Sequence, residues 1–231
     1  MASLVEARRQ FNHATVFDAW QSFALQLSRA PCGCCKLRYQ CSRKSPQGVP
    51  RAMAKIDESR LFIPVRIAVL TMSDTRSLAE DKSGNTLAAM IAEAGHTLAD
   101  RALVKDDVAA IRAQVQAWID DPNIDVVITT GGTGFTGRDV TPEAVMPLFE
   151  KHIDGFAAIF HMLSYQKIET STIQSRACGG VTRGTYIFCL PGSPGACKDA
   201  WHGILKWQLD NRHRPCNFVE IMPRLEEHRR S

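Results

Sequence analysis

The feature that most constrains the fold is the run Arg66-Ile-Ala-Val-Leu-Thr-Met72, which is almost continuously apolar and rich in β-branched residues. Such a run is typical of a strand buried on both faces, as in a parallel sheet. Further strands are predicted at Thr97–Val104, Asp125–Thr130 and Tyr186–Leu190. Helical patterns separate these strands, so the sequence predicts a three-layer α/β fold, with a mostly parallel sheet and helices on both of its faces.

The predicted helices have apolar residues at helical spacing and recognisable ends. Ser83 is the predicted N-cap of the first helix, which Gly95 ends. Asp106 and Asp107 precede the second helix, which Pro122 breaks. Further helix is predicted from Pro142 onward, including Phe156–Leu163, and over Ala196–Leu209. We assign residues 61–223 to this single α/β domain.

The leading segment differs from the rest of the chain in charge. Residues 1–52 contain eight Lys and Arg against two Asp and Glu, whereas the remainder contains twenty against twenty-two. The predicted fold therefore offers no basic face for a nucleic-acid function. We expect residues 1–60 to be a non-native or disordered extension, with the natural start near Met53, and residues 224–231 to be a charged tail. A partner-binding helix and an organellar transit peptide are the alternatives for the extension.

Composition and hydropathy exclude several classes of protein. With 45% hydrophobic and 23% charged residues, the chain is not collagen-like, coiled-coil or fully disordered. No apolar run reaches the roughly 18 residues that a membrane helix needs. The N-terminus also lacks the apolar segment of a secretory signal, so the expected location is the cytoplasm.

The eight cysteines fall into two groups. Cys32, Cys34, Cys35 and Cys41 crowd together and could hold zinc, but the paired C-x₂-C spacing is missing, which favours an unstructured tail. The other four are scattered among apolar neighbours, as buried thiols are. They are Cys178, Cys189, Cys197 and Cys216.

The loops after the predicted strands should meet at one edge of the sheet, where ligands bind in this architecture. The most informative is Thr129-Thr-Gly-Gly-Thr-Gly134, between a buried strand and a helix. Its glycines let successive backbone N–H groups face an anion, and Thr130 and Thr133 add hydroxyl donors. A phosphate is the predicted ligand, with a tight turn as the alternative. The pattern is neither the dinucleotide fingerprint nor a Walker loop.

Two neighbouring loops contribute carboxylates and hydroxyls. Asp106 and Asp139 are predicted to face one another across the strand ends, where they could place Mg²⁺ against a nucleotide. Stabilisation of the helix dipole is the alternative for Asp106. Ser73 and Asp74 end the first strand, and Ser83-Gly84 at the next helix could either bind an anion or cap the helix. No protein metal centre is predicted.

The fourth loop, Pro191-Gly-Ser193, closes the last predicted strand. The sequence Gly-Ser-Pro-Gly195 is one residue short of the G-x-S-x-G elbow, which disfavours a serine hydrolase. A rigid turn that presents backbone N–H groups and Ser193 to a ligand is the favoured interpretation.

These motifs together resemble the MoaB/MogA family of molybdenum cofactor biosynthesis, from about Phe62 to Pro223. The motifs are Thr129–Gly134, Arg138-Asp-Val-Thr-Pro142, Glu80-Asp-Lys-Ser-Gly84 and Leu190–Ser193. The lead-in Phe62–Arg66, the helix Ala109–Trp118 and the ending Arg214–Phe218 look more like MoaB than MogA. Residues 1–52 match nothing in the family, and Pro194-Gly195 departs from it.

The resemblance implies a fold that binds molybdopterin, a pterin dithiolene with a terminal phosphate. Active members transfer AMP from ATP to that phosphate, with Mg²⁺ accompanying the ATP. Asp106 and Asp139 match the two functional aspartates of the family. The phosphate of the pterin would lie against Gly131, Gly132, Thr133 and Gly134. The rest of the pocket would be lined by Ser73, Asp74, Ser83, Gly84, Thr130, Pro191, Gly192 and Ser193.

Three functions stay open at this point. Some MoaB proteins are thought not to adenylylate and lack the first aspartate, but this chain keeps Asp106, so the activity stays open. The leading hypothesis is a molybdopterin adenylyltransferase. The alternatives are a molybdopterin carrier or scaffold without turnover, and an unrelated enzyme that binds a nucleotide or sugar phosphate. The resemblance further implies a homotrimer or hexamer, with other molybdenum cofactor biosynthesis proteins as partners. Phe156, Phe160 and Met162 are the local candidates for the subunit contact.

Overall fold

The computed structural model describes residues 55–74 and 77–229 of the chain. The predictions about residues 1–52, including the cysteine cluster, and about the start near Met53 therefore lie outside the described residues. Within the described part, no helix is long and apolar enough to cross a membrane.

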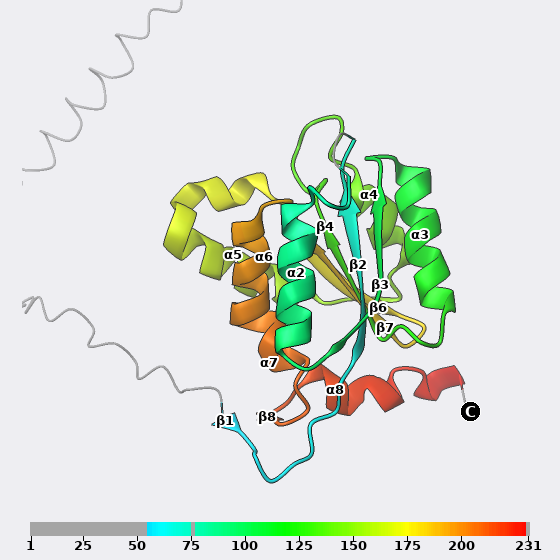
Figure 1. Cartoon of the computed structure of the whole chain (residues 1–231), viewed down its shortest axis with the longest axis vertical. Coiled ribbons are helices and arrows are strands. Elements are labelled where there is room, and N and C mark those ends of the chain that lie inside the picture. The colour runs from blue at the N-terminus through cyan, green and yellow to red at the C-terminus, as the bar shows by residue number, and fades with distance from the viewer. Residues whose placement is uncertain (1–54, 75–76, 230–231) are drawn as a thin grey trace, which may run out of the picture. The chain divides into compact units, whose positions relative to one another are not determined.

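A six-stranded sheet with the order β3-β2-β4-β7-β6-β5 forms the centre of the described fold (Figure 1). Its first four strands run parallel, and β6 and β5 are antiparallel to their neighbours in the sheet. The sheet is therefore mostly parallel, as predicted. The strands are β2 (Arg66–Met72), β3 (Thr97–Val104), β4 (Val126–Thr130), β5 (Lys151–His152), β6 (Cys178–Thr182) and β7 (Thr185–Leu190).

Helices cover both faces of this sheet, which confirms the three layers (Figure 1). One face carries α2 (Lys82–Glu93), α5 (Asp154–Ile168) and α6 (Pro194–Ala200). The last of these continues through the π-helical stretch η4 (Trp201–Leu205) into α7 (Lys206–Gln208). The other face carries α3 (Val108–Asp120) and α4 (Thr141–Val145).

The strand side chains divide between two cores with a period of two, because successive residues of a strand point to opposite faces. In β4, Val126 and Ile128 pack under α2 and α6, whereas Val127 packs under α3. In β7, Phe188 and Cys189 alternate in the same way. The near-continuous apolar runs in the sequence follow directly from this burial on both sides.

The sequence did not predict β6, and two of its glycines explain why. A Cβ atom on Gly180 would clash with the ring of Phe149, and one on Gly179 would lie 3.2 Å from the ring of Phe156. The residues at these two positions must be small, so β6 lacks the run of apolar side chains that identifies the other strands in the sequence. The cysteine prediction is wrong for Cys216, which is exposed, whereas Cys189 and Cys197 are buried.

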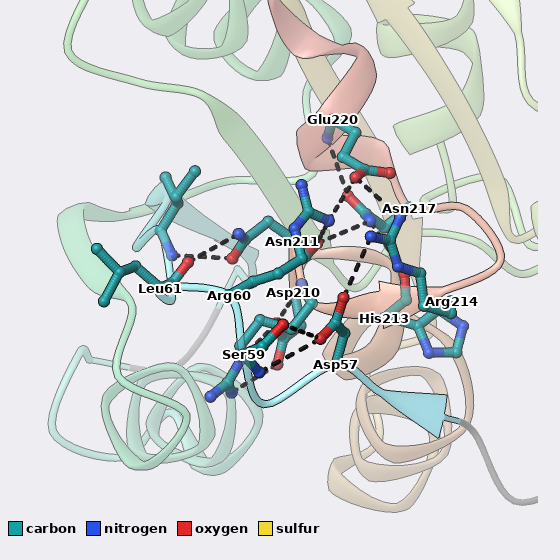
Figure 2. A network of polar contacts seen from close by, with 12 residues as sticks. Asp57, Ser59, Arg60, Leu61, Asp210, Asn211, His213, Arg214, Asn217 and Glu220 are labelled. Atoms are coloured by element: carbon teal, nitrogen blue, oxygen red, sulfur yellow. Dashed lines mark hydrogen bonds and ion pairs between the residues drawn. The ribbon is translucent and has the colours of Figure 1, made fainter.

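The segment that precedes β2 is tied to the C-terminal part of the chain. Strand β1 (Lys55–Ile56) pairs with β8 (His213–Arg214), and Asn211 donates to Leu61 O at 2.9 Å. Figure 2 shows the network, in which Arg60 reaches both Asn211 O and Glu220. The folded part thus begins upstream of the expected boundary at residue 61. The C-terminal segment also engages the fold, since Arg229 pairs with Glu150.

Candidate functional site

The loops at the carboxyl ends of the parallel strands lie against one another. Gly131 N donates to Leu190 O at 3.0 Å, and the Ser83 hydroxyl donates to Gly192 O at 2.8 Å. The backbone N–H of Asp106 donates to Asp74 Oδ1 at 3.3 Å. The candidate residues from all four loops therefore share one edge of the sheet.

The glycine-rich loop after β4, residues 131–134, is the candidate anion-binding nest. Gly131 and Gly132 have φ values of +112° and +61°, in the left-handed region that favours glycine. The four carbonyls of residues 131–134 all accept hydrogen bonds from outside the loop. Their donors are Thr141 Oγ1 to Gly131 at 2.9 Å, Thr141 N to Gly132 at 3.0 Å, Arg176 N to Thr133 at 2.9 Å and Arg176 Nε to Gly134 at 2.9 Å.

This arrangement leaves backbone donors available. The N–H groups of Gly132 and Thr133 donate to no acceptor among residues 55–74 and 77–229. Two consecutive N–H groups in a left-handed turn, with no acceptor among the described residues, can converge on an anion. The sequence anticipated the glycines of this nest, but it missed Arg176, whose guanidinium also donates to Asp139 O at 2.7 Å and pairs with Glu143.

The pKa values of Asp106 and Asp139 are shifted in opposite directions by this environment. Burial and the charges of Asp74 and Asp139 raise the pKa of Asp106, against the opposing charge of Arg138. Burial also acts to raise the pKa of Asp139, but hydrogen bonds from Thr136 outweigh it and hold that pKa below its usual value. The Thr136 N and Oγ1 atoms lie 2.9 and 2.6 Å from Asp139 Oδ2. Asp139 is thus a stabilised anion, whereas Asp106 is an anion under repulsion.

Several predicted ligand-binding residues support the loops through buried contacts. Thr130 is fully buried, and its hydroxyl donates to Pro191 O at 3.0 Å rather than to the face of the nest. Ser83 is also buried, and Gly84 N donates to Asp81 Oδ1 at 2.9 Å. The N-cap of α2 is therefore Asp81 and not Ser83, because a carboxylate reaches the first free N–H groups one turn into the helix.

The turn after β7 is closely fitted to the nest. A Cβ atom on Gly192 would lie 3.2 Å from Gly131 Cα, so the two backbones are nearly in contact. Ser193 is exposed and caps α6 by accepting from Ala196 N at 3.1 Å. Pro194 occupies the first turn of that helix, where its fixed φ and missing N–H are compatible with helical structure.

Comparisons with known proteins agree on one family. The family model described as "Probable molybdopterin binding domain" matches residues 68–211. The molybdenum cofactor biosynthesis protein B of Escherichia coli K12 is 52% identical over 157 residues, which cover 68% of this chain and 92% of that protein. The name of that protein agrees with the resemblance to MoaB.

Comparison with solved structures indicates the same family. A crystal structure of a molybdenum cofactor biosynthesis protein B has a TM-score of 0.66 at 38% identity, covering 73% of this chain and 99% of its own. The tungsten cofactor synthesizing protein MoaB from Pyrococcus furiosus has a TM-score of 0.53 at 29% identity, with coverages of 73% and 98%. The chain belongs to the MoaB/MogA family of molybdenum cofactor biosynthesis proteins.

Proposed function

We propose that this chain binds molybdopterin through its terminal phosphate and transfers AMP from Mg-ATP to that phosphate. The observation that carries this proposal is an ionisable carboxylate placed against a phosphate-binding nest. Asp106 Oδ1 lies 3.0 Å from the position that a Cβ atom on Gly132 would occupy. A carboxylate at this position repels a bound phosphate, so it would weaken a site that only binds phosphate. It would help a site that also holds a cation and a second phosphate, because the cation binds to the carboxylate.

The nest accounts for recognition of the pterin phosphate. The N–H groups of Gly132 and Thr133 would donate to its oxygens, and the nearby Ser193 hydroxyl is exposed at the same edge. These donors are neutral, so they bind an anion without needing a change of protonation. Molybdopterin binding should therefore depend on the shape of the loop more than on the aspartates.

The transfer step is a displacement at phosphorus. An oxygen of the molybdopterin phosphate attacks the α-phosphorus of ATP and forms the new P–O bond. The bond from that phosphorus to the bridging oxygen breaks, and pyrophosphate leaves with the electron pair. The chain holds the attacking phosphate and orients the nucleotide, because positioning and electrostatics supply most of the catalysis in phosphoryl transfer.

The residues present suit a magnesium ion that arrives with ATP. Mg²⁺ is usually held by one or two carboxylates together with substrate phosphates. Asp106 and Asp139 offer those carboxylates, and the described residues contain no group of three or more His, Cys, Asp or Glu that could hold a metal alone. Bound there, Mg²⁺ would neutralise the charge that builds up between the two phosphates.

The decisive experiment is ATP-dependent AMP transfer to molybdopterin by the purified full chain. Asp106→Asn and Asp139→Asn keep side-chain shape and remove one charge each. We expect both variants to bind molybdopterin as the wild type does, while AMP transfer falls by roughly 10²-fold. Wild-type binding without any turnover would instead support a carrier. A wild-type chain that fails to bind molybdopterin would overturn both functions.

The nest itself can be tested at Gly132, where the backbone has a positive φ and a side chain would clash with the Thr141 hydroxyl. Gly132→Val should abolish molybdopterin binding. Gly137→Ala is the matched control, because it lies in the same loop with open space around it. Equal binding by the two variants would contradict the assignment of the nest.

The oligomeric state belongs to the same proposal, as a homotrimer or a pair of trimers. Phe156 and Phe160 lie in the core and are excluded as contact residues, whereas Met162 is 66% exposed. Other large apolar side chains are exposed on α5 and on the 3₁₀ segment Glu169–Gln174: Ile159, Tyr165, Ile168 and Ile173. Light scattering at micromolar concentration should show a trimer or hexamer, and a monomer would contradict this part of the proposal.

A further inference from the structure

Two cysteines lie opposite each other in the sheet, close to the strand ends that carry the nest. Cys178 of β6 is the register partner of Cys189 of β7, in an antiparallel pair. Cys189 is in turn the register partner of Thr129 in β4. Residues directly opposite in an antiparallel pair have Cα atoms about 4.5–5.5 Å apart, within the span of about 4.4–6.8 Å found in disulfides.

The two thiols have different environments. Cys189 is fully buried, whereas Cys178 is half-buried. The neighbouring Cys189 thiol and the charge of Arg176 lower the pKa of Cys178, against burial and the charge of Glu143. The neighbouring Cys178 thiol and burial raise the pKa of Cys189 well above its usual value. Cys178 is therefore the more accessible of the two thiols and the more readily ionised.

Cys178 is also connected to the nest. It lies two residues after Arg176, whose backbone N–H and guanidinium hold the carbonyls of Thr133, Gly134 and Asp139. A covalent change at Cys178 that shifts the end of β6 must therefore act on residues 131–139. The other described cysteines lack these features: burial raises the pKa of Cys197 to about 11, and Cys216 is exposed.

We propose that Cys178 and Cys189 are a modification site, a dithiol that hydroperoxides convert to a disulfide, and that this disulfide loosens the nest. The Cys178 thiolate attacks the O–O bond of the hydroperoxide; an S–O bond forms, the O–O bond breaks, and water or an alcohol leaves. The Cys189 sulfur then attacks the resulting sulfenic acid. The S–S bond forms, the S–O bond breaks, and water leaves with the thiol proton. The two sulfurs lose two electrons, which reduce the hydroperoxide.

Peptide mapping of the full chain tests the chemistry. The chain is treated with hydrogen peroxide, its remaining thiols are blocked, and it is digested with trypsin. Cleavage after Arg176, Arg183 and Lys198 separates Cys178 from Cys189, so a disulfide joins peptide 177–183 to peptide 184–198. Fragmentation then distinguishes Cys189 from Cys197, which lies in the same peptide.

We expect the joined peptide through Cys189 in the wild type, with Cys178 oxidised at least ~10-fold faster than Cys216. In Cys189→Ala, a sulfenic-acid probe should label Cys178, and in Cys178→Ala it should leave Cys189 unlabelled. Cys216→Ser is the matched control and should behave as the wild type. Absence of the joined peptide, or oxidation of Cys178 no faster than of Cys216, would overturn the proposal even if a cysteine variant fails to fold.

The link to the nest has its own measurement, which does not depend on the proposed enzyme activity. Amide hydrogen exchange in peptides that cover residues 131–139 should be faster in the oxidised wild type than in the reduced one. Cys178→Ala treated with the same peroxide should show no such change. A disulfide that forms without faster exchange in this loop would show that the dithiol is not coupled to the nest.

Discussion

Asp81 and Asp106 both lie near the carboxyl edge of the sheet, yet their surroundings are opposite. The Asp81 side chain is 0% exposed, and it accepts hydrogen bonds from Thr71 Oγ1 at 2.6 Å and Gly84 N at 2.9 Å, with Arg101 Nη2 at 2.8 Å. The Asp106 carboxylate is half-buried among other carboxylates, and no hydrogen bond to it comes from any residue that the structure describes.

The difference separates a carboxylate that the fold satisfies from one that, in the proposed function, takes part in the chemistry. Burial alone would raise the pKa of Asp81, but the hydrogen bonds from Thr71 and Gly84 and the partner Arg101 lower it, so its ionised form is favoured by folding. Folding disfavours the ionised form of Asp106. A charge that the fold does not satisfy is able to bind something from outside.

The largest effect that tests this contrast is on stability. Asp81→Ala removes the partner of Arg101 and the N-cap of α2 together, and it should lower the free energy of unfolding by about 3–5 kcal/mol. Urea denaturation measures this change. Asp107→Ala is the matched control, since Asp107 is an exposed N-cap whose carboxylate accepts from Ala110 N at 2.8 Å, and its loss should cost about 1 kcal/mol. Equal losses in the free energy of unfolding would contradict a larger structural role for Asp81 than for Asp107.

A smaller effect should distinguish support of the nest from support of the fold. Arg176→Lys replaces a guanidinium that donates to two loop carbonyls by one ammonium, and we expect molybdopterin binding to weaken by roughly 10-fold. Arg112 similarly donates to Ala144 O and Glu143 O, but on the α3 side of the sheet. Arg112→Lys should therefore retain wild-type binding when both variants are titrated with molybdopterin and its fluorescence is followed. Similar weakening in both variants would contradict a specific role for Arg176.

The sequence predicts much of the fold because burial on both faces leaves a direct pattern. The boundaries of β2 and β3 were predicted correctly, and Gly95 ends α2 with a φ of +83°. Such local rules do not reveal contacts between distant residues. Arg176 is polar, is about forty residues from the loop that it holds, and has no motif around it, so only the fold places it at the site.

The same reasoning applies to the geometry of the candidate site. The glycines of the nest can be found because a left-handed backbone requires them, and Asp106 can be found because it follows a strand. These patterns do not show which groups a side chain contacts in the folded chain. Thr130 was expected to donate to a phosphate, but alternation along β4 turns its hydroxyl toward Pro191 O and Cys197.

The smallest predicted effect is a shift in melting temperature, and it measures most directly the contrast between Asp81 and Asp106. Because folding raises the pKa of Asp106, its ionised form costs stability at pH 7, and this cost is absent below both the folded and unfolded pKa values. Asp106→Asn should therefore raise the melting temperature of the free protein by roughly 1–3 °C at pH 7, with the gain vanishing below about pH 4.

Asp139→Asn provides the control with the opposite sign. Hydrogen bonds from Thr136 keep the pKa of Asp139 low in the folded chain, so its ionised form contributes stability above the unfolded pKa that is lost as the pH falls. This variant should melt at a lower temperature than the wild type at pH 7, and the two should converge in acid. Calorimetry across this pH range measures both variants together. Melting temperatures that shift in the same direction in both variants would mean that the fold stabilises the ionised form of Asp106. The physical argument for assigning Asp106 to the reaction would then fail.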